Sequence, residues 1–511
     1  MSRLSNQAYH RSKFTDTMKR YLLTTGLLLS VFWLQANNLQ ISNVTQTGNN
    51  ISFTLSWENS WNTTNNINPL YPNNWDAVWV FVKYQNQIDN LWKPAKLSST
   101  AGDHSVTGGG ATLQVDPVAD SMGVFIRRSS PGAGNISSAA VTLRMGPRIG
   151  TGAFNFKVFG VEMVHAPQDT LQAGDGLVNG SLYFSPITIT SARQSSGLIT
   201  GELYSGSPAI PASFPMGFNA FYCMKYEATN EQWVDFLNTL TYDQQASRID
   251  AAPNSAAGTN AYTASVTHEG IVEIVVPGLN NTQPAVFGCD LTDDNAFNTS
   301  NDGQNIPFVA VGKGDMLAYL DWAGLRPMTE LEYEKACRGP RPRISTEYAW
   351  GSTNFAPRTR ANLVNGGTAT EASSATVVNG QVIAASGSPS HGPARNGIFA
   401  TGSSGRESSG ASFYGMMEMS GNLWELMVTA GSGGLTITAN SNGDGSLSTN
   451  GNANVATWPD PLGTTGIATR GGSWWETTSN SVFTRIAYRH NVAVGVGRSY
   501  VYGIRGVRSA N

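Results

Sequence analysis

The sequence predicts an α+β protein in which an all-β sandwich domain precedes a larger domain of mixed helices and strands. Apolar and polar residues alternate with a period of two over 51–57, which is typical of a half-buried strand, and the run over 76–84 repeats the strand-like theme. Farther along, Thr229 and Thr329 each stand three residues before a glutamine or glutamate, and apolar residues follow at helical spacing. These patterns indicate two domains, at residues 37–157 and 158–511.

The first domain carries the signals of an antiparallel β-sandwich. Strand-like runs over 111–115 and 123–127 continue the alternation, and clusters of Gly, Asn, Pro and Ser separate the runs as turns do. Its tryptophans are either inward-facing core residues, the favoured interpretation, or an aromatic platform for carbohydrate, since an indole offers an apolar face and an N–H. Trp61 and Trp75, in an Asn-rich loop, are the pair expected to be more exposed. The five residues are Trp57, Trp61, Trp75, Trp79 and Trp92.

Three amphipathic helices are predicted in the larger domain. Thr229 caps the first, and the second is expected over 315–322. Thr329 caps the third, Glu332 completes its capping box, and Gly339 ends it because glycine readily adopts the left-handed conformation that closes a helix.

Composition excludes several classes of function. Charged residues make up 13% of the chain, the formal net charge is −3, and Lys and Arg are not clustered, so nucleic acid is not an expected partner. The six histidines lack metal-ligand spacing, and the chain has no Walker loop, Gly-x-Ser-x-Gly elbow or His-Glu-x-x-His motif. Low charge with abundant Gly, Asn, Ser and Thr favours a loop-rich extracellular protein, with polar inserts near 243–305 and 364–391.

The first 36 residues are typical of a secretory signal peptide. Basic residues precede a short apolar run over 22–34, and Ala36 is the expected cleavage position, while Met18 is a possible true start. The alternative is an uncleaved N-terminal anchor. No other stretch reaches the length of a membrane span. The sequence therefore predicts export to the medium or to a bacterial cell surface, with no transmembrane segment after signal removal.

Three motifs of the larger domain are shared with a known family. They are GNLWE at 421–425, RGGSW at 470–474 and GIRGVR at 503–508. Together with the capped helices, they make residues 161–511 resemble the formylglycine-generating enzyme (sulfatase-modifying factor) family, a variant of the C-type-lectin-like fold. The resemblance implies that fold for the larger domain.

In that family the C-terminal segment carries the active-site cysteines, and this chain has none there. Two cysteines would fall about where Glu476 and Ser481 stand, so the resemblance implies that the nucleophile and the copper ligands are lost together. The three cysteines of the chain, Cys223, Cys289 and Cys337, can form at most one disulfide. We therefore expect no enzyme activity and no copper, with an oxidase of the formylglycine-generating type as a distant alternative.

The family also binds calcium, which prefers oxygen ligands. Carried over to this sequence, the first site would use the carboxylates of Glu418 and Glu425 and the carbonyls of Gly421 and Leu423. The alternative is that Glu425 and Asn422 only cap and tie loops. A second family site would begin at Asn362 and Leu363, but its aspartate cannot be placed in the divergent loop that follows. A structural calcium ion is thus one possible cofactor.

The segment from 474 to 504 mixes aromatic, apolar and polar residues without helical or strand period. It is similar to the variable regions of binding proteins diversified by bacterial retroelements, and Tyr, Trp and Arg are common anchors of such surfaces. We expect an exported protein that binds a protein or glycan ligand there; the alternative is a subunit that assembles with copies of itself into a layer, tube or filament. The expected contact residues are Trp475, Glu476, Phe483, Tyr488, His490, Tyr500 and Tyr502.

Overall fold

The structure is a computed structural model. It describes residues 38–65, 72–146, 153–177, 182–263, 272–279, 282–384, 392–489, 494–495 and 497–510. The predicted signal peptide, the start at Met18 and His490 lie outside these residues. Among the described helices, none combines the length and the apolar character that crossing a bilayer requires.

The N-terminal strands form two sheets that pack face to face, as a sandwich does. Inward residues of β2, such as Phe53, meet inward residues of β3, such as Val80, and both are almost fully buried. The alternation in the sequence therefore corresponds to real sheet faces. The first sheet has the order β1-β2-β8-β5, with β1 (Gln40–Thr47), β2 (Asn50–Asn62), β5 (Ser105–Gly109) and β8 (Gly132–Arg144).

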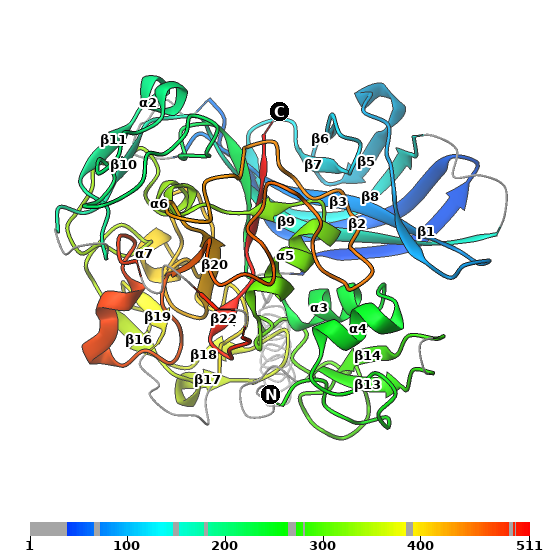
Figure 1. The fold of residues 1–511 in the computed structure, drawn as a ribbon. Coiled ribbons are helices and arrows are strands. Elements are labelled where there is room, and N and C mark those ends of the chain that lie inside the picture. The colour runs from blue at the N-terminus through cyan, green and yellow to red at the C-terminus, as the bar shows by residue number, and fades with distance from the viewer. Residues whose placement is uncertain are drawn as a thin grey trace, which may run out of the picture. The chain divides into compact units, whose positions relative to one another are not determined.

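The second sheet joins the N-terminal strands to the rest of the chain (Figure 1). The predicted domain boundary at 157/158 lies inside β9, which pairs with β3 on one side and with β12 on the other. The strand order of this second sheet is β15-β23-β12-β9-β3-β7-β6, and β4 pairs with β3. The strands are β3 (Asp76–Asn86), β4 (Trp92–Ala95), β6 (Leu113–Pro117), β7 (Val124–Arg128), β9 (Phe154–Ala166), β12 (Phe221–Met224), β15 (Arg326–Pro327) and β23 (Gly506–Ser509).

The two faces of β3 belong to two different cores. Val78 and Val80 face the sandwich, whereas Trp79 and Phe81 face the larger core of the C-terminal part. The indole N–H of Trp79 donates to the carbonyl of Ala323 at 2.8 Å, so the sheet is tied directly to the helical region. A strand buried on both faces explains the nearly continuous apolar run at this position.

The tryptophans of the sandwich region differ in exposure. Trp57 and Trp79 are fully buried, as the core interpretation predicts, whereas Trp61, Trp75 and Trp92 are half-buried. Trp75 stacks on His165 with 4.0 Å between ring centroids, and the Trp61 N–H donates to Asn74 at 3.3 Å. Trp61 and Trp75, which the sequence predicts to be the more exposed pair, thus both contact neighbouring side chains of the protein.

The three helices predicted from the sequence are present. The side chains of Thr229 and Thr329 each accept a hydrogen bond from the backbone N–H three residues farther along the chain. The side chain of that residue, Gln232 or Glu332, accepts the N–H of the threonine in return, which completes a capping box. Gly339 follows the third helix with φ 66°, as predicted for its end. The helices are α2 (Ser191–Ser196), α3 (Asn230–Leu237), α4 (Tyr242–Arg248), α5 (Lys313–Trp322), α6 (Glu330–Arg338) and α7 (Arg406–Ser409), with 3-10 turns at Ala101–Asp103, Arg360–Asn362 and Thr478–Thr484.

Small sheets complete the C-terminal part. In the sheet that matters for the site, β20 pairs with β21 and, in parallel, with β22. This arrangement brings the GNLWE, RGGSW and GIRGVR motifs together. These strands are β20 (Trp424–Val428), β21 (Ile467–Arg470) and β22 (Tyr502–Gly503); the two-stranded sheets are β10 (Leu171–Ala173) with β11 (Ile187–Ile189), β13 (Val272–Val276) with β14 (Val286–Cys289), β16 (Ala356–Arg358) with β19 (Gln381–Ile383), and β17 (Leu363–Val364) with β18 (Ala372–Ser373).

Candidate functional site

Helix α6 holds the C-terminal segment through a buried carboxylate. Glu330 Oε1 accepts from Arg470 Nε at 3.0 Å and from Arg489 Nε at 2.8 Å, and its Oε2 accepts from a second nitrogen of Arg489 at 2.7 Å. All three side chains are fully or almost fully buried. The two arginines hold the pKa of Glu330 at about 2, because their charges outweigh the cost of burying the carboxylate. The start and the middle of the segment are thereby fixed to one helix.

The GNLWE motif lies over a second buried cluster, made of three carboxylates and one guanidinium. Arg505 Nε donates to Glu425 at 2.6 Å, and its other two nitrogens donate to the carbonyls of Met224 and Met417. Glu227 accepts from the side chain of Asn422 at 2.6 Å and from the backbone N–H of Leu423 at 3.0 Å. Strands β20 and β22 are therefore tied to the end of β12.

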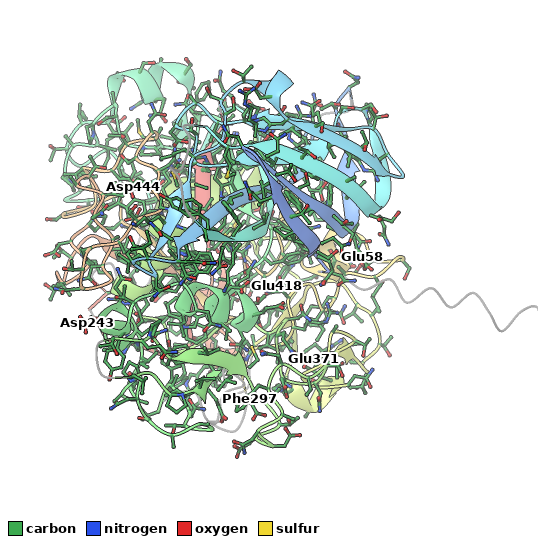
Figure 2. All side chains as sticks on the ribbon, turned by 90° about the vertical axis from the view of Figure 1, so that its right-hand side faces the viewer. Glu58, Asp243, Phe297, Glu371, Glu418 and Asp444 are labelled. Atoms are coloured by element: carbon green, nitrogen blue, oxygen red, sulfur yellow. The ribbon has the colours of Figure 1, made fainter. Side chains whose placement is uncertain are left out.

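Glu418 is the third carboxylate of this cluster (Figure 2). Its Oε1 accepts the N–H of Gly397 at 2.8 Å, and its Oε2 is buried with no hydrogen-bond partner among the described residues. It lines a cavity of about 10 Å³, which is room for about one water molecule. Burial raises the pKa of Glu418 to about 7, and burial also raises the pKa values of Glu227 and Glu425.

The first predicted calcium site stays a prediction. Glu425 Oε1 accepts from Arg505, and Glu418 Oε1 accepts the N–H of Gly397. The Oε2 atom of each carboxylate is buried with no hydrogen-bond partner among the described residues. Burial raises the pKa values of both groups, and a bound calcium ion would have to offset that cost, because a hard cation needs the carboxylate. Arg505 already supplies positive charge at Glu425, which supports the alternative that Glu425 ties segments of the chain together.

The second predicted calcium position is also satisfied by protein groups. The carbonyl of Asn362 accepts the N–H of Ser374 at 2.7 Å, and Leu363 pairs with Ser373 in the small sheet of β17 and β18. The buried carboxylate of this region is Glu371 (Figure 2). It accepts from the backbone N–H groups of Arg395 and Gly367 and from the side chain of Arg360. An arginine and two backbone amides thus satisfy this carboxylate, and the second calcium position stays a prediction.

A buried, hydrogen-bonded carboxylate, that of Glu476, stands at the position of the first expected cysteine. Glu476 is buried, and its Oε1 accepts the indole N–H of Trp424 at 3.0 Å and the hydroxyl of Ser473 at 3.4 Å. Burial raises its pKa. Ser481, at the second expected position, is half-buried in the 3-10 turn Thr478–Thr484.

All three cysteines of the chain are buried and free. Burial raises the pKa of Cys223 to about 12 and also raises the pKa values of Cys289 and Cys337. A thiol reacts as its thiolate, so these three groups are poor nucleophiles near neutral pH. Their positions agree with structural roles in the core.

The aromatic residues expected to contact a ligand fall into two groups. Trp475, Phe483, Tyr500 and Tyr502 are half-buried, so part of each ring reaches the surface. Trp475 lies edge-on to Tyr500 with 5.8 Å between ring centroids, and this pair covers buried Trp474. We use the name tail face for the set Trp475, Phe483, Tyr500 and Tyr502. Trp475 and Tyr500 pack around Trp474, Phe483 packs beside Tyr488, and Tyr502 packs against the main core.

Two other expected contact residues are buried. Tyr488 is 9% exposed and packs beside Tyr183 and Phe483, and Glu476 is 8% exposed. Both side chains therefore support the tail face from beneath and offer little surface of their own. The contact roles of all these residues remain predictions.

Sequence reasoning missed the residues that organise the site from below. Glu227 stands just ahead of the α3 capping box, and Arg505 belongs to the GIRGVR motif, yet neither was expected to face the other. Glu227 and Lys225 are the two charged residues in the stretch 221–228, and charges in so apolar a stretch are the available signal, because a buried charge needs a partner.

Replacement of Glu418 by glutamine should make stability less dependent on pH. Its folded pKa of about 7 lies above the ordinary 4.5, so the folded state binds this proton more tightly, and unfolding free energy falls as pH rises from 4.5 through 7. The variant lacks this titration. Its free energy of unfolding, relative to that of wild type, should therefore increase by about 2–3 kcal/mol between pH 5 and pH 8. Urea unfolding at both pH values measures this shift, and an equal difference at both would contradict the assignment.

Comparisons with known proteins place most of this region in one family. Residues 188–510 match the family of sulfatase-modifying factor enzyme 1-like domains. A stretch of 140 residues is 31% identical to a formylglycine-generating enzyme from Thermomonospora curvata. The match covers 27% of this chain and 42% of that enzyme, so the chain spans less than half the length of this curated relative.

Solved structures give a weaker likeness. The U1 variant of a Major Tropism Determinant has 12% sequence identity and a TM-score of 0.23, with 83% of this chain and 93% of that chain covered. The I1 variant has 12% identity and a TM-score of 0.23, with coverage of 81% and 85%. TM-scores this low do not establish a shared fold.

Proposed function

Because the chain belongs to the family of sulfatase-modifying factor enzyme 1-like domains, we propose that it is a binding protein that uses the family's domain without its oxidase chemistry. One observation carries the proposal: a buried, hydrogen-bonded Glu476 stands where the first active-site cysteine is expected. The buried thiols of Cys223, Cys289 and Cys337 support it, because none can replace the missing nucleophile.

The tail face is the proposed contact surface for a protein or glycan ligand. Aromatic rings that are fixed from below and partly open above contribute large contact area at low entropic cost. Buried Arg470 and Arg489, both bound to Glu330, hold the backbone that carries these rings. We also propose that the protein is exported to the medium or to a cell surface, since the sequence begins with a signal-like segment.

Replacement of Tyr500 by alanine should weaken ligand binding by about 10- to 30-fold, because truncation of a partly buried aromatic anchor at an interface costs about 2 kcal/mol. The measurement is a screen of wild-type protein against glycan and protein arrays, followed by affinity measurement for the hits. Ile199→Ala is the control, since it truncates a large surface side chain away from the tail face, in the loop after α2.

Two further measurements define the outcomes that would contradict the proposal. Wild-type protein with copper(I) and a cysteine-containing peptide should yield no formylglycine by mass spectrometry, and product formation would restore the oxidase interpretation. Light scattering should show a single species of constant mass. Ordered polymers would instead assign the tail face to contacts between copies of the chain.

A further inference from the structure

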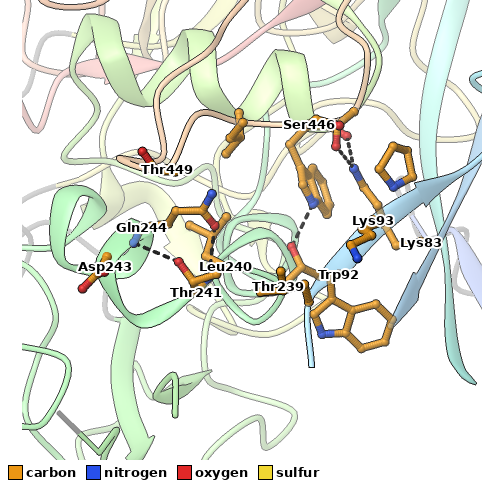
Figure 3. A pocket seen from close by; sticks show the side chains of 15 residues that line it. Lys83, Trp92, Lys93, Thr239, Leu240, Thr241, Asp243, Gln244, Ser446 and Thr449 are labelled. Atoms are coloured by element: carbon orange, nitrogen blue, oxygen red, sulfur yellow. Dashed lines mark hydrogen bonds between the residues drawn. The ribbon is translucent and has the colours of Figure 1, made fainter. Parts of the chain in front are cut away.

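A separate cavity of about 480 Å³ opens beside strand β4 (Figure 3). Four segments of the chain form it: β3–β4, the connection from α3 to α4, the end of α5, and the loop 445–449. None of its lining residues belongs to the C-terminal segment 470–508. Its volume lies within the range of about 300–1,000 Å³ that is usual for small-ligand pockets.

The floor and walls of this cavity are fixed by hydrogen bonds. Lys83 Nζ donates to the carbonyls of Trp322 at 2.8 Å and Gly445 at 2.6 Å. The Trp322 indole N–H donates to Thr239 at 2.8 Å, and Gln244 donates to the carbonyl of Ser448 at 2.9 Å. Figure 3 shows several of these bonds around the opening. The cavity is therefore formed before any ligand arrives, which lowers the entropic cost of binding.

The rim combines one aromatic ring with several polar groups. Trp92 is half-buried at one side of the opening, and Asp243 and Thr449 lie across from it in Figure 3. Ser446, Thr449 and Asp243 are exposed side chains that can exchange their bonds to water for bonds to a ligand. The indole of Trp92 offers an apolar face. Lys157 Nζ lies 5.3 Å from the centroid of this ring, so a cation–π contact helps to hold the ring in place.

The charges around the cavity do not favour an ionic ligand. Lys93 on the rim is paired with Asp89 at 2.5 Å, and Asp243, which also lines the cavity, is exposed. Buried Lys83 uses its ammonium for the two carbonyls, and burial lowers its pKa to about 7. A phosphate or carboxylate would meet the carboxylate of Asp243, and a wholly apolar ligand would strip water from the hydroxyls and this carboxylate.

We propose that this cavity binds a neutral saccharide, with an apolar sugar face stacked on Trp92 and sugar hydroxyls bonded to Asp243, Ser446 and Thr449. A pyranose has one face of C–H groups and an edge of hydroxyls that both donate and accept. That chemistry matches a rim with one ring, two hydroxyls and one carboxylate. Trp92, one of the five sandwich tryptophans, lines this cavity.

The test is calorimetric titration of the full chain with glucose, galactose, mannose, N-acetylglucosamine and their short oligomers, with glucuronate as the anionic probe. We expect at least one neutral saccharide to bind. Trp92→Ala should weaken that binding at least tenfold, and Thr449→Arg should do the same by filling the opening from an exposed loop. Tyr500→Ala, in the tail face, should leave it unchanged.

Three results would overturn this inference: no binding by any neutral saccharide of the panel, binding of glucuronate alone, or neutral binding that both pocket variants retain. If Trp92→Ala does not fold, Thr449→Arg decides the question, because Thr449 is exposed and its side chain supports no buried contact. Saccharide binding abolished by Tyr500→Ala but not by Thr449→Arg would place the sugar on the tail face instead, and would leave the proposed function standing without this pocket.

Discussion

Replacement of Glu330 by glutamine is expected to lower the free energy of unfolding by about 3–5 kcal/mol at pH 7, because removal of one partner from a buried ion cluster leaves the others uncompensated. The neutral amide would leave the guanidinium groups of Arg470 and Arg489 buried beside an uncharged group. It would also disturb the bonds from Thr429 and Ala430 to Oε2. Urea unfolding followed by near-UV circular dichroism measures the loss.

Asp89→Asn is the matched control for this change. Its partner Lys93 is 41% exposed, and exposed ion pairs contribute only about 0–1 kcal/mol. The control should therefore differ little from wild type. A Glu330 variant as stable as the control would mean that the two arginines find other partners and that this cluster does not hold the C-terminal segment.

The Glu330 cluster also predicts the response to acid. Its folded pKa of about 2 lies below the ordinary 4.5, so the stabilisation is present above pH 4.5 and is lost as pH falls towards 2. The full loss corresponds to about 3 kcal/mol. The glutamine variant lacks this titration, so wild type and variant should approach each other in stability between pH 4.5 and pH 2.

Local patterns in the sequence were sufficient for individual elements. The alternation over 51–57 lies within β2, the strand-like run over 76–84 lies within β3, and the boxes at Thr229 and Thr329 cap α3 and α6. Each of these signals depends on residues within one turn or one strand, and side-chain period and capping chemistry act over that range. The RGGSW and GIRGVR motifs likewise identified the family, which the match over 188–510 confirms.

Contacts between distant residues could not be predicted in this way. Glu330 and Arg470 are 140 positions apart, and the saccharide pocket needs four separate segments. The exposure of each tryptophan depends on which neighbour covers it, so Trp92 reaches a cavity while Trp75 stacks on His165. For the same reason, the sequence did not show that Arg505 reaches Glu425, one of the predicted calcium ligands.

Replacement of Arg505 by methionine is expected to destabilise the protein by about 3–5 kcal/mol at pH 8. Here buried carboxylates lose their cation, whereas in Glu330→Gln buried cations lose their carboxylate. Methionine fills most of the volume, but Glu425 loses its buried partner, and the carbonyls of Met224 and Met417 lose their donors. Because β22 and β23 flank Arg505, the tail face should also lose affinity for its ligand in this variant.

The pH dependence distinguishes this cluster from the first. Burial already raises the pKa values of Glu227, Glu418 and Glu425, and loss of Arg505 raises them further above the ordinary 4.5. The folded state then binds more protons than the unfolded state, so stability increases as pH falls from 8 towards 5. Arg505→Met should thus recover part of its loss at pH 5, and Arg505→Met with Glu425→Gln should recover part of it at pH 8. A loss that is the same at both pH values would show that packing around Arg505, rather than the buried carboxylates, holds the three motifs together.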